Sequence, residues 1–358
     1  MKSITYLFFS VLLITSCQTD VQKTVQPEKI PIKVVILSMF EPGADEGDRP
    51  GEFQYWVEKL PLKDTLPFEY GFDRNLRYSK ELGVLGMVTG IGNTQAGISV
   101  TALGLDDRFD FTNTYWLVAG IAGVDPADAP TGSAAWAEWI IDGDLSHEID
   151  AREIEKGWKT GYIPLRRTTP YEQPVSENNE GVVIKLNEGL VNWAYEMTKD
   201  TPLPDNEEIK NMREQYKGYA AADMKPFVLK GDQLAGSTYW HGKLLNDWAN
   251  DWVDYWTEGQ GNFVTSAMEE MGTYHALARL EKAGKVDKDR LLVLRTASNF
   301  TMQWPGISAY QSLAGEKLTG KGYSAYVPSL ESAYAVGSPV VLELSKNWDK
   351  YGASVPTK

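Results

Sequence analysis

The sequence predicts an α/β protein of three layers, in which helices cover both faces of a mostly parallel central sheet. Short runs of β-branched and apolar residues alternate along the chain with longer segments of helical periodicity. Several of these apolar runs end in glycine or polar residues. In a parallel sheet such strand ends lie at one edge, where ligands bind.

Five segments are expected to be strands, because each is apolar enough to be buried on both faces. They are residues 32–38, 82–88, 115–119, 227–229 and 291–298. The second runs into Thr89-Gly90-Ile91-Gly92 and the third into Gly120-Ile121-Ala122-Gly123. We predict a glycine turn at both places, since glycine allows a strand and the following element to approach closely.

Apolar residues recur at helical spacing in the segments between these strands. The predicted helices are residues 93–105, 187–199, 204–217, 243–256, 268–282 and 329–351, with Pro339 expected to kink the last one. Residues 40–80, 125–180 and 301–328 are rich in glycine, proline and polar residues. They are expected to be long surface loops or insertions that could act as lids.

Length and composition limit the classes of function. The chain has 358 residues, of which 42% are hydrophobic, and this supports one large core. Its formal net charge is −14, with no run of basic residues. An acidic surface of this kind argues against binding to nucleic acid, which needs clustered Lys and Arg. It argues equally against electrostatic adhesion to anionic lipid.

The N-terminal segment has the pattern of a targeting signal. Lys2 is followed by a short apolar run, residues 4–14, and then by Cys17, the only cysteine of the chain. The segment resembles a bacterial lipoprotein signal, which implies a signal peptide at residues 1–16, lipidation of Cys17, a tether at residues 17–30 and a domain at residues 31–358. A plain secretory signal with an incidental Cys17 is the alternative.

Removal of this signal leaves no stretch of the ~18–20 apolar residues that a membrane-spanning helix requires. The membrane would then be contacted only through the lipid on Cys17. The resemblance implies an outer-membrane location, facing the periplasm or exposed at the surface. A single cysteine also excludes internal disulfides and thiolate metal clusters.

A carboxylate at the mouth of a predicted helix and an amide at the end of a predicted strand form the most specific pattern. The first lies in Met268-Glu269-Glu270-Met271-Gly272-Thr273-Tyr274, and the second in Arg295-Thr296-Ala297-Ser298-Asn299-Phe300. Both motifs resemble the nucleoside phosphorylase and nucleosidase superfamily. Within it, the chain from residue 31 onward is most similar to the purine nucleoside permease family. The resemblance implies a nucleoside phosphorylase-like fold.

Glu269 is the first candidate catalytic residue. The resemblance implies that its carboxylate accepts hydrogen bonds from the ribose hydroxyls and that Met268 packs under the sugar. A glutamate in a first helical turn is also favoured by the helix dipole alone, so Glu269 could have no further role. Glu270 follows it on the helix and is the weaker candidate.

Asn299 is the second candidate, at the purine. Cleavage of the glycosidic bond leaves electron density on the base, which a hydrogen bond at N7 would stabilise. Where the family has Asp, that residue can donate a proton as a general acid, whereas an Asn cannot. Asn299 therefore favours a 6-oxopurine or a loosely selective site. A strand-end asparagine in an ordinary turn is the alternative.

The glycine turns and the attacking group complete the expected site. The resemblance places Thr89, Gly90 and Gly92 beside the ribose and Gly120 at a second turn of the site. One branch of phosphorylases carries a phosphate-binding Arg where this chain has Val118. That difference favours attack by water over attack by phosphate. Hydrolysis needs a base, for which Glu41, just after the first strand, is the candidate, with Asp45 or Glu46 as alternatives.

Aromatic residues near the two motifs are candidates for stacking on the purine. Phe263 and Phe300 flank the motifs, and Trp240 with His241 precedes a predicted helix and could form part of a lid. Trp248, Trp252 and Tyr255 share one helical face, which is more typical of core packing. No metal-ligand spacing is present among the histidines, so neither a metal nor a cofactor is expected, apart from phosphate as a co-substrate.

Three functions remain open from the sequence. The first is cleavage of the N-glycosidic bond of purine nucleosides, by a nucleosidase more than by a phosphorylase. The second is capture of nucleosides by a lipoprotein that delivers them to a membrane transport partner without catalysis. The third, a structural lipoprotein, would require the motif matches to be coincidental. The resemblance is also compatible with a homo-oligomer.

Overall fold

The predicted three-layer α/β architecture is confirmed by a computed structural model, which describes residues 28–172, 181–318 and 325–357. The centre of the sheet contains β2 (Val34–Ser38), β5 (Val84–Val88), β7 (Tyr115–Val124) and β16 (Leu291–Phe300). β2 pairs in parallel with β5 and β7, and β7 pairs in parallel with β16. These four strands are almost completely buried, as their apolar sequences predict.

Further strands extend this sheet on both sides. β5 pairs with β4 (Leu76–Ser79), which pairs with β3 (Asp64–Leu66). On the other side lie β15 (Phe263–Ala267), β14 (Asp232–Ala235), β9 (Trp139–Asp142) and β12 (Val183–Lys185). β16 also pairs with β8 (Ala134–Trp136), which pairs with β13 (Val228–Lys230). Two small pairs stand apart: β1 (Ile30–Pro31) with β6 (Phe109–Asp110), and β10 (Ser146–Glu148) with β11 (Tyr162–Pro164).

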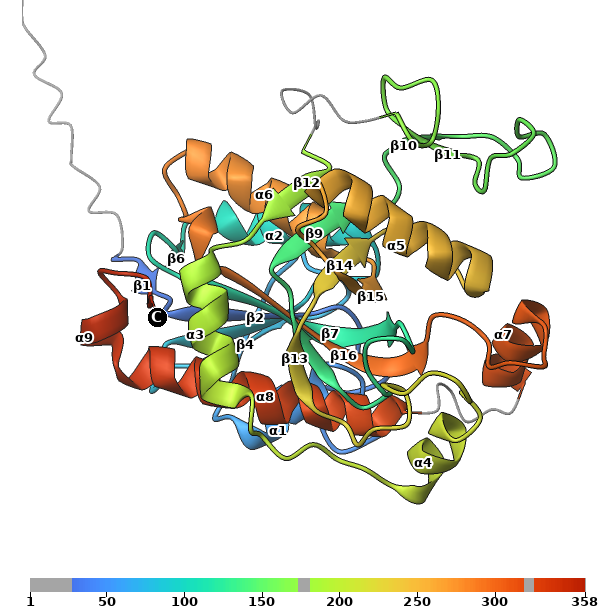
Figure 1. The fold of residues 1–358 in the computed structure, drawn as a ribbon. Helices are drawn as coiled ribbons and strands as arrows, with labels where there is room; N and C mark the ends of the chain where they lie inside the picture. The colour runs from blue at the N-terminus through green and yellow to red at the C-terminus, as the bar shows by residue number, and fades with distance from the viewer. Residues whose placement is uncertain (1–27, 173–180, 319–324, 358) are drawn as a thin grey trace, which may run out of the picture.

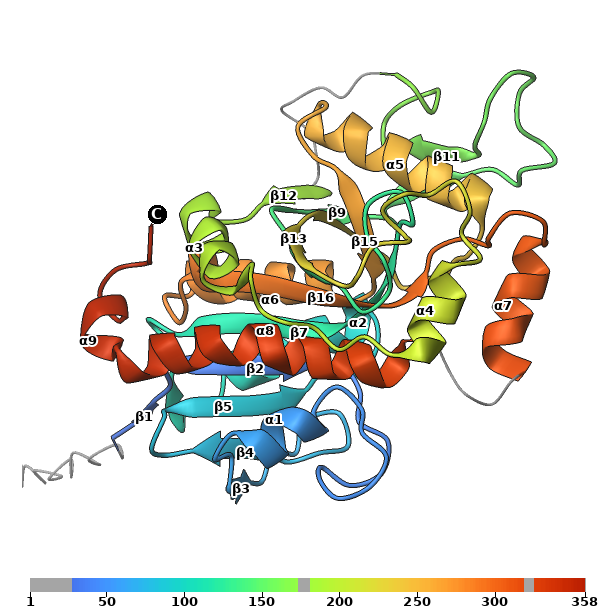
Figure 2. The ribbon, with the colours of Figure 1, turned by 60° about the horizontal axis from the view of Figure 1, so that its bottom comes forward.

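Helices cover the two faces of the sheet (Figures 1 and 2). One face is covered by α2 (Asn93–Gly104), α6 (Glu270–Lys282) and α5 (Lys243–Thr257), and the other by α8 (Tyr326–Lys346), α1 (Gln54–Lys59) and α3 (Glu188–Thr198). The remaining helices are α4 (Glu207–Arg213), the 3-10 turn η1 (Lys288–Arg290), α7 (Ala309–Leu318) and α9 (Trp348–Tyr351). No helix among the described residues has the length and apolar character needed to cross a membrane.

The structure corrects several local predictions. Gly120–Gly123 is not a turn, because β7 continues through these residues to Val124 and pairs there with β16. The expected helix 204–217 is helical only at Glu207–Arg213. The predicted loops 40–80 and 125–180 contain α1 and six strands in the described part of the chain, namely β3, β4 and β8 to β11. The expected helix 329–351 is divided at Asn347 into α8 and α9, and the kink expected at Pro339, inside α8, stays a prediction.

Candidate functional site

The carboxyl ends of the central strands surround a cavity of about 310 Å³. Its lining residues follow β2, lie in the last part of β7, and belong to the ends of β15 and β16. They are Met39, Phe40, Glu52, Ile91, Ile121–Gly123, Thr238–Trp240, Ser266–Glu269, Arg295, Ser298, Asn299, Thr301 and Tyr326. A cavity at this edge of a mostly parallel sheet is the expected place for a ligand.

Glu269 lines this cavity and directly precedes the first residue of α6. Its side chain is held from two other elements. Oε1 accepts a hydrogen bond from the Gly92 N–H at 2.9 Å, and Oε2 accepts from Nη2 of Arg295 at 2.7 Å. Burial raises the pKa of Glu269, and the charge of Arg295 opposes that shift. The carboxylate is thus fixed in direction while it still borders the cavity.

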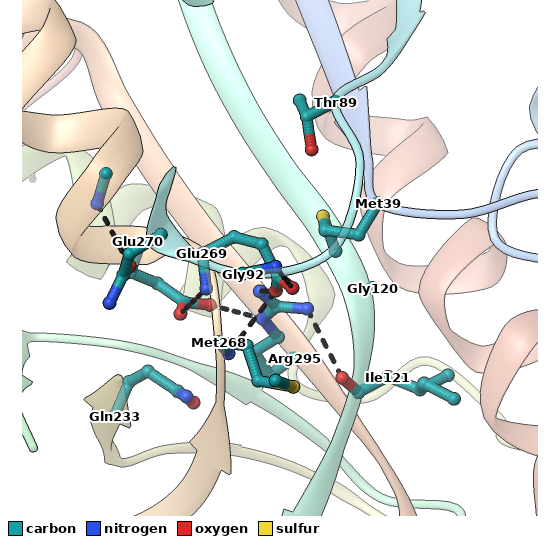
Figure 3. A network of polar contacts seen from close by, with 12 residues as sticks. Met39, Thr89, Gly92, Gly120, Ile121, Gln233, Met268, Glu269, Glu270 and Arg295 are labelled. Carbon is teal, nitrogen blue, oxygen red and sulfur yellow. Dashed lines mark hydrogen bonds and ion pairs between the residues drawn. The ribbon is translucent and has the colours of Figure 1, made fainter. Parts of the chain in front are cut away.

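Arg295 is a buried guanidinium on β16, and Figure 3 shows it between two carboxylates. Its Nε donates to Oε1 of Glu270, and its Nη1 donates to the Ile121 carbonyl oxygen at 3.2 Å. Burial alone would lower the pKa of Arg295, but Glu270, Glu269 and Glu52 outweigh it and raise that pKa above its ordinary value. Arg295 therefore stays charged, and its charge is already shared between Glu269 and Glu270.

Glu52 is a second cavity-lining acid, and only 5% of it is exposed. Its Oε2 accepts from the Met39 N–H and its Oε1 from the Ile121 N–H, both at 2.7 Å. Burial raises the pKa of Glu52 to about 8, against the opposing charge of Arg295 and with help from Glu269. Such a carboxyl group can exchange a proton near neutral pH. Glu52, Glu269 and Arg295 form the charged end of the cavity.

Gly120 makes room for this charged end. A Cβ atom at Gly120 would lie 2.0 Å from Cε of Met39, 2.5 Å from Oε1 of Glu52 and 2.6 Å from Nη1 of Arg295. A larger residue would push these side chains apart. The sequence prediction placed Gly120 in the site through a turn, whereas its actual contribution is the absence of a side chain within a strand.

Within the described part of the chain, the end of the cavity around Asn299 carries no charged side chain. It consists of Tyr239, Trp240, Ser298, Asn299 and Thr301, called the neutral end below. Asn299 donates from Nδ2 to Oη of Tyr239 and to the Phe300 carbonyl oxygen, each at 3.1 Å. Its Oδ1 accepts from Oγ of Ser298 at 2.9 Å. The amide is thus fixed at the cavity wall.

Trp240 presents an aromatic ring to the neutral end and rests on other aromatic rings. Its ring centre lies 6.2 Å from that of Trp248 and 6.1 Å from that of Phe263. Trp248, Trp252 and Trp256 belong to a hydrophobic cluster beneath it, so Trp248 and Trp252 pack in the core, as their spacing predicts. This support holds Trp240 as a rigid surface for a flat ligand.

Several predicted site residues lie outside the cavity lining. Glu41 is buried, and its carboxylate accepts backbone N–H groups of Gly51, Phe53 and Gln54. Phe263 belongs to the aromatic cluster below Trp240. Phe300 packs on Tyr216 with ring centres 3.9 Å apart. These contacts leave none of the three in position to touch a ligand in the cavity.

Four further predicted site residues, Thr89, Gly90, Gly92 and His241, do not line the cavity. Thr89 is buried, bonds to the Gly90 carbonyl oxygen, and lies apart from the polar cluster in Figure 3. Gly90 and Gly92 have φ angles of +85° and +91°, so the turn between β5 and α2 is formed as predicted. Neither ring nitrogen of His241 has a hydrogen-bond partner within the described chain, and burial lowers the pKa of His241 to about 4. Cys17 lies outside the described residues.

Two residues of the charged end were not singled out from the sequence. Arg295 directly follows the apolar run Leu291-Leu292-Val293-Leu294. A charged side chain in a buried strand needs a partner, so the sequence did contain a signal for Arg295. Glu52 lies beside the end of β2, but in the sequence the loop of residues 40–51 separates it from that strand. No sequence pattern indicated that return.

Comparisons with known proteins relate the whole domain to one family. Residues 31–356 match the family model described as purine nucleoside permease. The purine nucleoside permease of Candida albicans is 29% identical over 322 residues, which cover 89% of this chain and 76% of that protein. A protein of Schizosaccharomyces pombe named "Probable purine nucleoside permease" is 31% identical over 271 residues, which cover 73% of this chain and 76% of that one.

Solved structures agree with the fold. The methylthioadenosine/S-adenosylhomocysteine (MTA/SAH) nucleosidase of Streptococcus pneumoniae matches 88% of this chain and 100% of its own, with 13% identity and a TM-score of 0.50. The Helicobacter pylori protein MTAN, with 5′-methylthioadenosine in its active site, matches 87% of this chain and 99% of its own, with 15% identity and a TM-score of 0.50. The predicted nucleoside phosphorylase-like fold is thereby confirmed.

Proposed function

The chain belongs to the purine nucleoside permease family, and from this premise we propose that it binds purine nucleosides and hydrolyses their N-glycosidic bond. One observation carries the proposal: a single cavity combines a fixed carboxylate, Glu269, with a second acid, Glu52, whose pKa lies near neutrality. The first suits a sugar diol and a developing positive charge. The second suits proton transfer.

In the proposed complex the ribose lies at the charged end and the purine at the neutral end. Glu269 accepts hydrogen bonds from the ribose hydroxyls, with Met268 beside the sugar. The purine stacks on Trp240 and meets the amide of Asn299. Both ends of the cavity lie along β16. One nucleoside can therefore contact Asn299 and also Glu269, which Arg295 holds in place. The binding mode remains a proposal that the geometry supports.

Charge favours water over phosphate as the attacking group. Among the described residues that line the cavity, Arg295 is the one positively charged side chain, and two carboxylates already share it. A phosphate anion would enter beside the carboxylate of Glu269 without an available cation, and like charges at close range repel. A neutral water molecule avoids that cost. A positively charged sugar transition state gains from the same carboxylates.

The proposed reaction is a substitution at the anomeric carbon. A water oxygen bonds to C1′ while the C1′–N9 bond breaks and its electron pair moves to the purine. The ionised Glu52 accepts the proton that water loses. Asn299 stabilises the departing base by hydrogen bonding and has no acidic proton to give, so the purine takes its proton from solvent. Glu52 then releases its proton to solvent, and the products are free base and ribose.

A second function, capture of nucleosides for transport without turnover, is favoured by the name of the family and of both fungal relatives. It uses the same cavity. The two functions differ in whether bound nucleoside is cleaved. A transport role further requires a separate membrane partner if no segment of the chain crosses the bilayer.

The finer location is also a proposal. We place the domain at a membrane surface through lipid attached to Cys17, which lies outside the described residues. The two named relatives are fungal, so this attachment rests on the N-terminal sequence alone. Mass spectrometry of the N-terminal peptide of the mature protein tests it: an unmodified Cys17, or a first residue elsewhere, would refute it.

Product analysis tests the main proposal. Residues 18–358 would be incubated with inosine, guanosine or adenosine, with and without phosphate, and the products separated by chromatography. Free base and ribose without phosphate are expected. Ribose 1-phosphate formed only with phosphate would replace hydrolysis by phosphorolysis. Intact nucleoside, with binding detected by calorimetry, would favour capture, and intact nucleoside without binding would refute both functions.

A further inference from the structure

We propose that Glu41 is a positioning residue for Glu52: its carboxylate closes the base of the loop of residues 40–51 and so holds the side chain of Glu52 at the cavity. Glu41 does not line the cavity and would act only through its neighbour in space. The inference deepens the proposed function and rests on the role of Glu52 in it.

The contacts of Glu41 lie on both sides of Glu52 in the chain. Oε1 of Glu41 accepts from the Gly51 N–H at 2.5 Å, and Oε2 accepts from the Phe53 and Gln54 N–H groups at 2.9 and 2.7 Å. α1 receives no side-chain cap from Phe53, the residue before it. Glu41 therefore supplies the acceptor that the free N–H groups at a helix start require.

The base of the loop is tightly packed around Glu52. The Glu52 N–H donates to the Phe40 carbonyl oxygen, and Oγ of Ser38 donates to the Glu52 carbonyl oxygen, both at 3.1 Å. A Cβ atom at Gly51 would lie 2.6 Å from Cδ of Pro42 and 2.8 Å from Cα of Glu41. The two ends of the loop thus lie side by side, and a change at one end moves the other.

Arg74 fixes Glu41 from the outer side. One guanidinium nitrogen of Arg74 donates to the carbonyl oxygens of Glu41 and Gly43, and the other pairs with Asp45 at 2.6 Å. Glu41 is thereby held by its backbone from outside the loop and by its carboxylate from inside. This arrangement explains a buried acid next to the cavity that touches no part of it.

Loss of the Glu41 carboxylate should change the surroundings of Glu52 in a measurable way. The charged groups that face Glu52 are Arg295, on β16, and Glu269, before α6. Burial is the largest cause of the raised pKa of Glu52. If the segment of residues 51–54 loosens, water reaches the carboxyl group and that pKa falls toward its ordinary value.

The test is a pH titration of Glu52 by ¹³C NMR on protein labelled at the glutamate carboxyl carbon, with the signal identified by its loss in Glu52→Gln. A midpoint near 8 is expected in the wild type. In Glu41→Gln and Glu41→Ala it should fall by at least ~1 pH unit, with the larger fall in Glu41→Ala. The kcat for nucleoside hydrolysis should fall ~10- to 100-fold, with a smaller change in KM, because positioning is lost and binding is kept.

Glu58→Gln is the matched control. Glu58 accepts from the Gly47 N–H in the same loop and from the Gln54 side chain, but it binds neither neighbour of Glu52. Its midpoint and kcat should equal those of the wild type. Arg74→Lys, at a partly exposed side chain, should lower the midpoint less than Glu41→Ala and in the same direction, and it decides the matter if the Glu41 variants fail to fold.

An unchanged Glu52 midpoint in folded Glu41→Ala or, failing that, in Arg74→Lys would overturn the inference. The NMR readout needs no turnover. If the wild type cleaves no nucleoside, the proposed function fails while the titration still decides whether Glu41 positions Glu52.

Discussion

The two ends of the cavity lie along the same strand, β16, yet they differ in charge. At the charged end Arg295 holds Glu269, and Glu52 lies opposite on its own loop. At the neutral end Asn299 is held by Tyr239 and Ser298, and none of the described residues that line this end is ionised. Under the proposed function, this difference divides the two tasks: charge would stabilise a cationic sugar at one end, and neutral hydrogen bonds with an aromatic surface would select the base at the other.

The largest expected effect is the loss of Glu269. Glu269→Ala should lower kcat/KM by at least ~10³-fold, because it removes the carboxylate that contacts the ribose in the transition state. Steady-state hydrolysis of inosine measures this loss, and circular dichroism checks the fold. Glu281→Ala, in the same helix but away from the cavity, is the control and should leave kcat/KM unchanged. Undiminished turnover in Glu269→Ala would remove the charged end from the mechanism.

Glu52 comes next. Glu52→Gln should lower kcat by ~10²- to 10⁴-fold, since an amide cannot accept the proton of water. The KM for inosine should change much less, because Glu269 and the neutral end still bind the nucleoside. Equal losses in Glu52→Gln and Glu58→Gln would show that a general effect on the loop, and not proton transfer, is being measured.

Asn299→Asp tests the selectivity of the neutral end. A protonatable carboxyl group suits N7 of a 6-aminopurine, so the ratio of kcat/KM for adenosine to that for inosine should rise by ~10-fold, about 1.4 kcal/mol. Competition between the two nucleosides in one reaction measures the ratio directly. Asn192→Asp, at a residue that accepts from Lys230 away from the cavity, should leave it unchanged. An unaltered ratio in Asn299→Asp would separate Asn299 from the base.

Trp240 provides the smallest expected effect. Trp240→Ala should raise KM by ~5-fold, which corresponds to about 1 kcal/mol, the lower end of the range for a base–aromatic stack, with little change in kcat. Trp240→Phe should recover most of the affinity because it keeps an aromatic face. If kcat falls as much as affinity, Trp240 contributes to the charged end and the division between the two ends is wrong.

Much of the fold and half of the site followed from the sequence, for reasons that particular residues illustrate. Apolar runs in the sequence predict the buried central strands. Glu269 and Asn299 belong to recognisable motifs and lie at or next to strand ends. Phe300 was misplaced because its ring packs on Tyr216 and not in the cavity, and Tyr216 is far from it in the sequence. Phe263 lies at the start of β15, the end of that strand far from Met268.

Glu52 could not be found from the sequence because many residues separate it from the end of β2. Glu41 is nearer to the end of β2 in sequence, yet Glu52 is the acid whose carboxyl group bonds to Met39 and faces the cavity. The closure of residues 40–51 brings it there, through hydrogen bonds that involve Ser38, Phe40 and Glu41. Such a return depends on backbone hydrogen bonds, which no residue pattern encodes.

The most direct test of the central claim is the pH dependence of phosphate-free inosine hydrolysis by the wild type, followed as kcat/KM between about pH 5.5 and 9.5. A base must be ionised, and Glu52 loses its proton as pH rises through about 8, so kcat/KM should rise with pH and level off above that midpoint. The same rise should be absent in Glu52→Gln. No phosphate-free hydrolysis at any pH, or a rate that falls as pH rises through 8, would contradict the account.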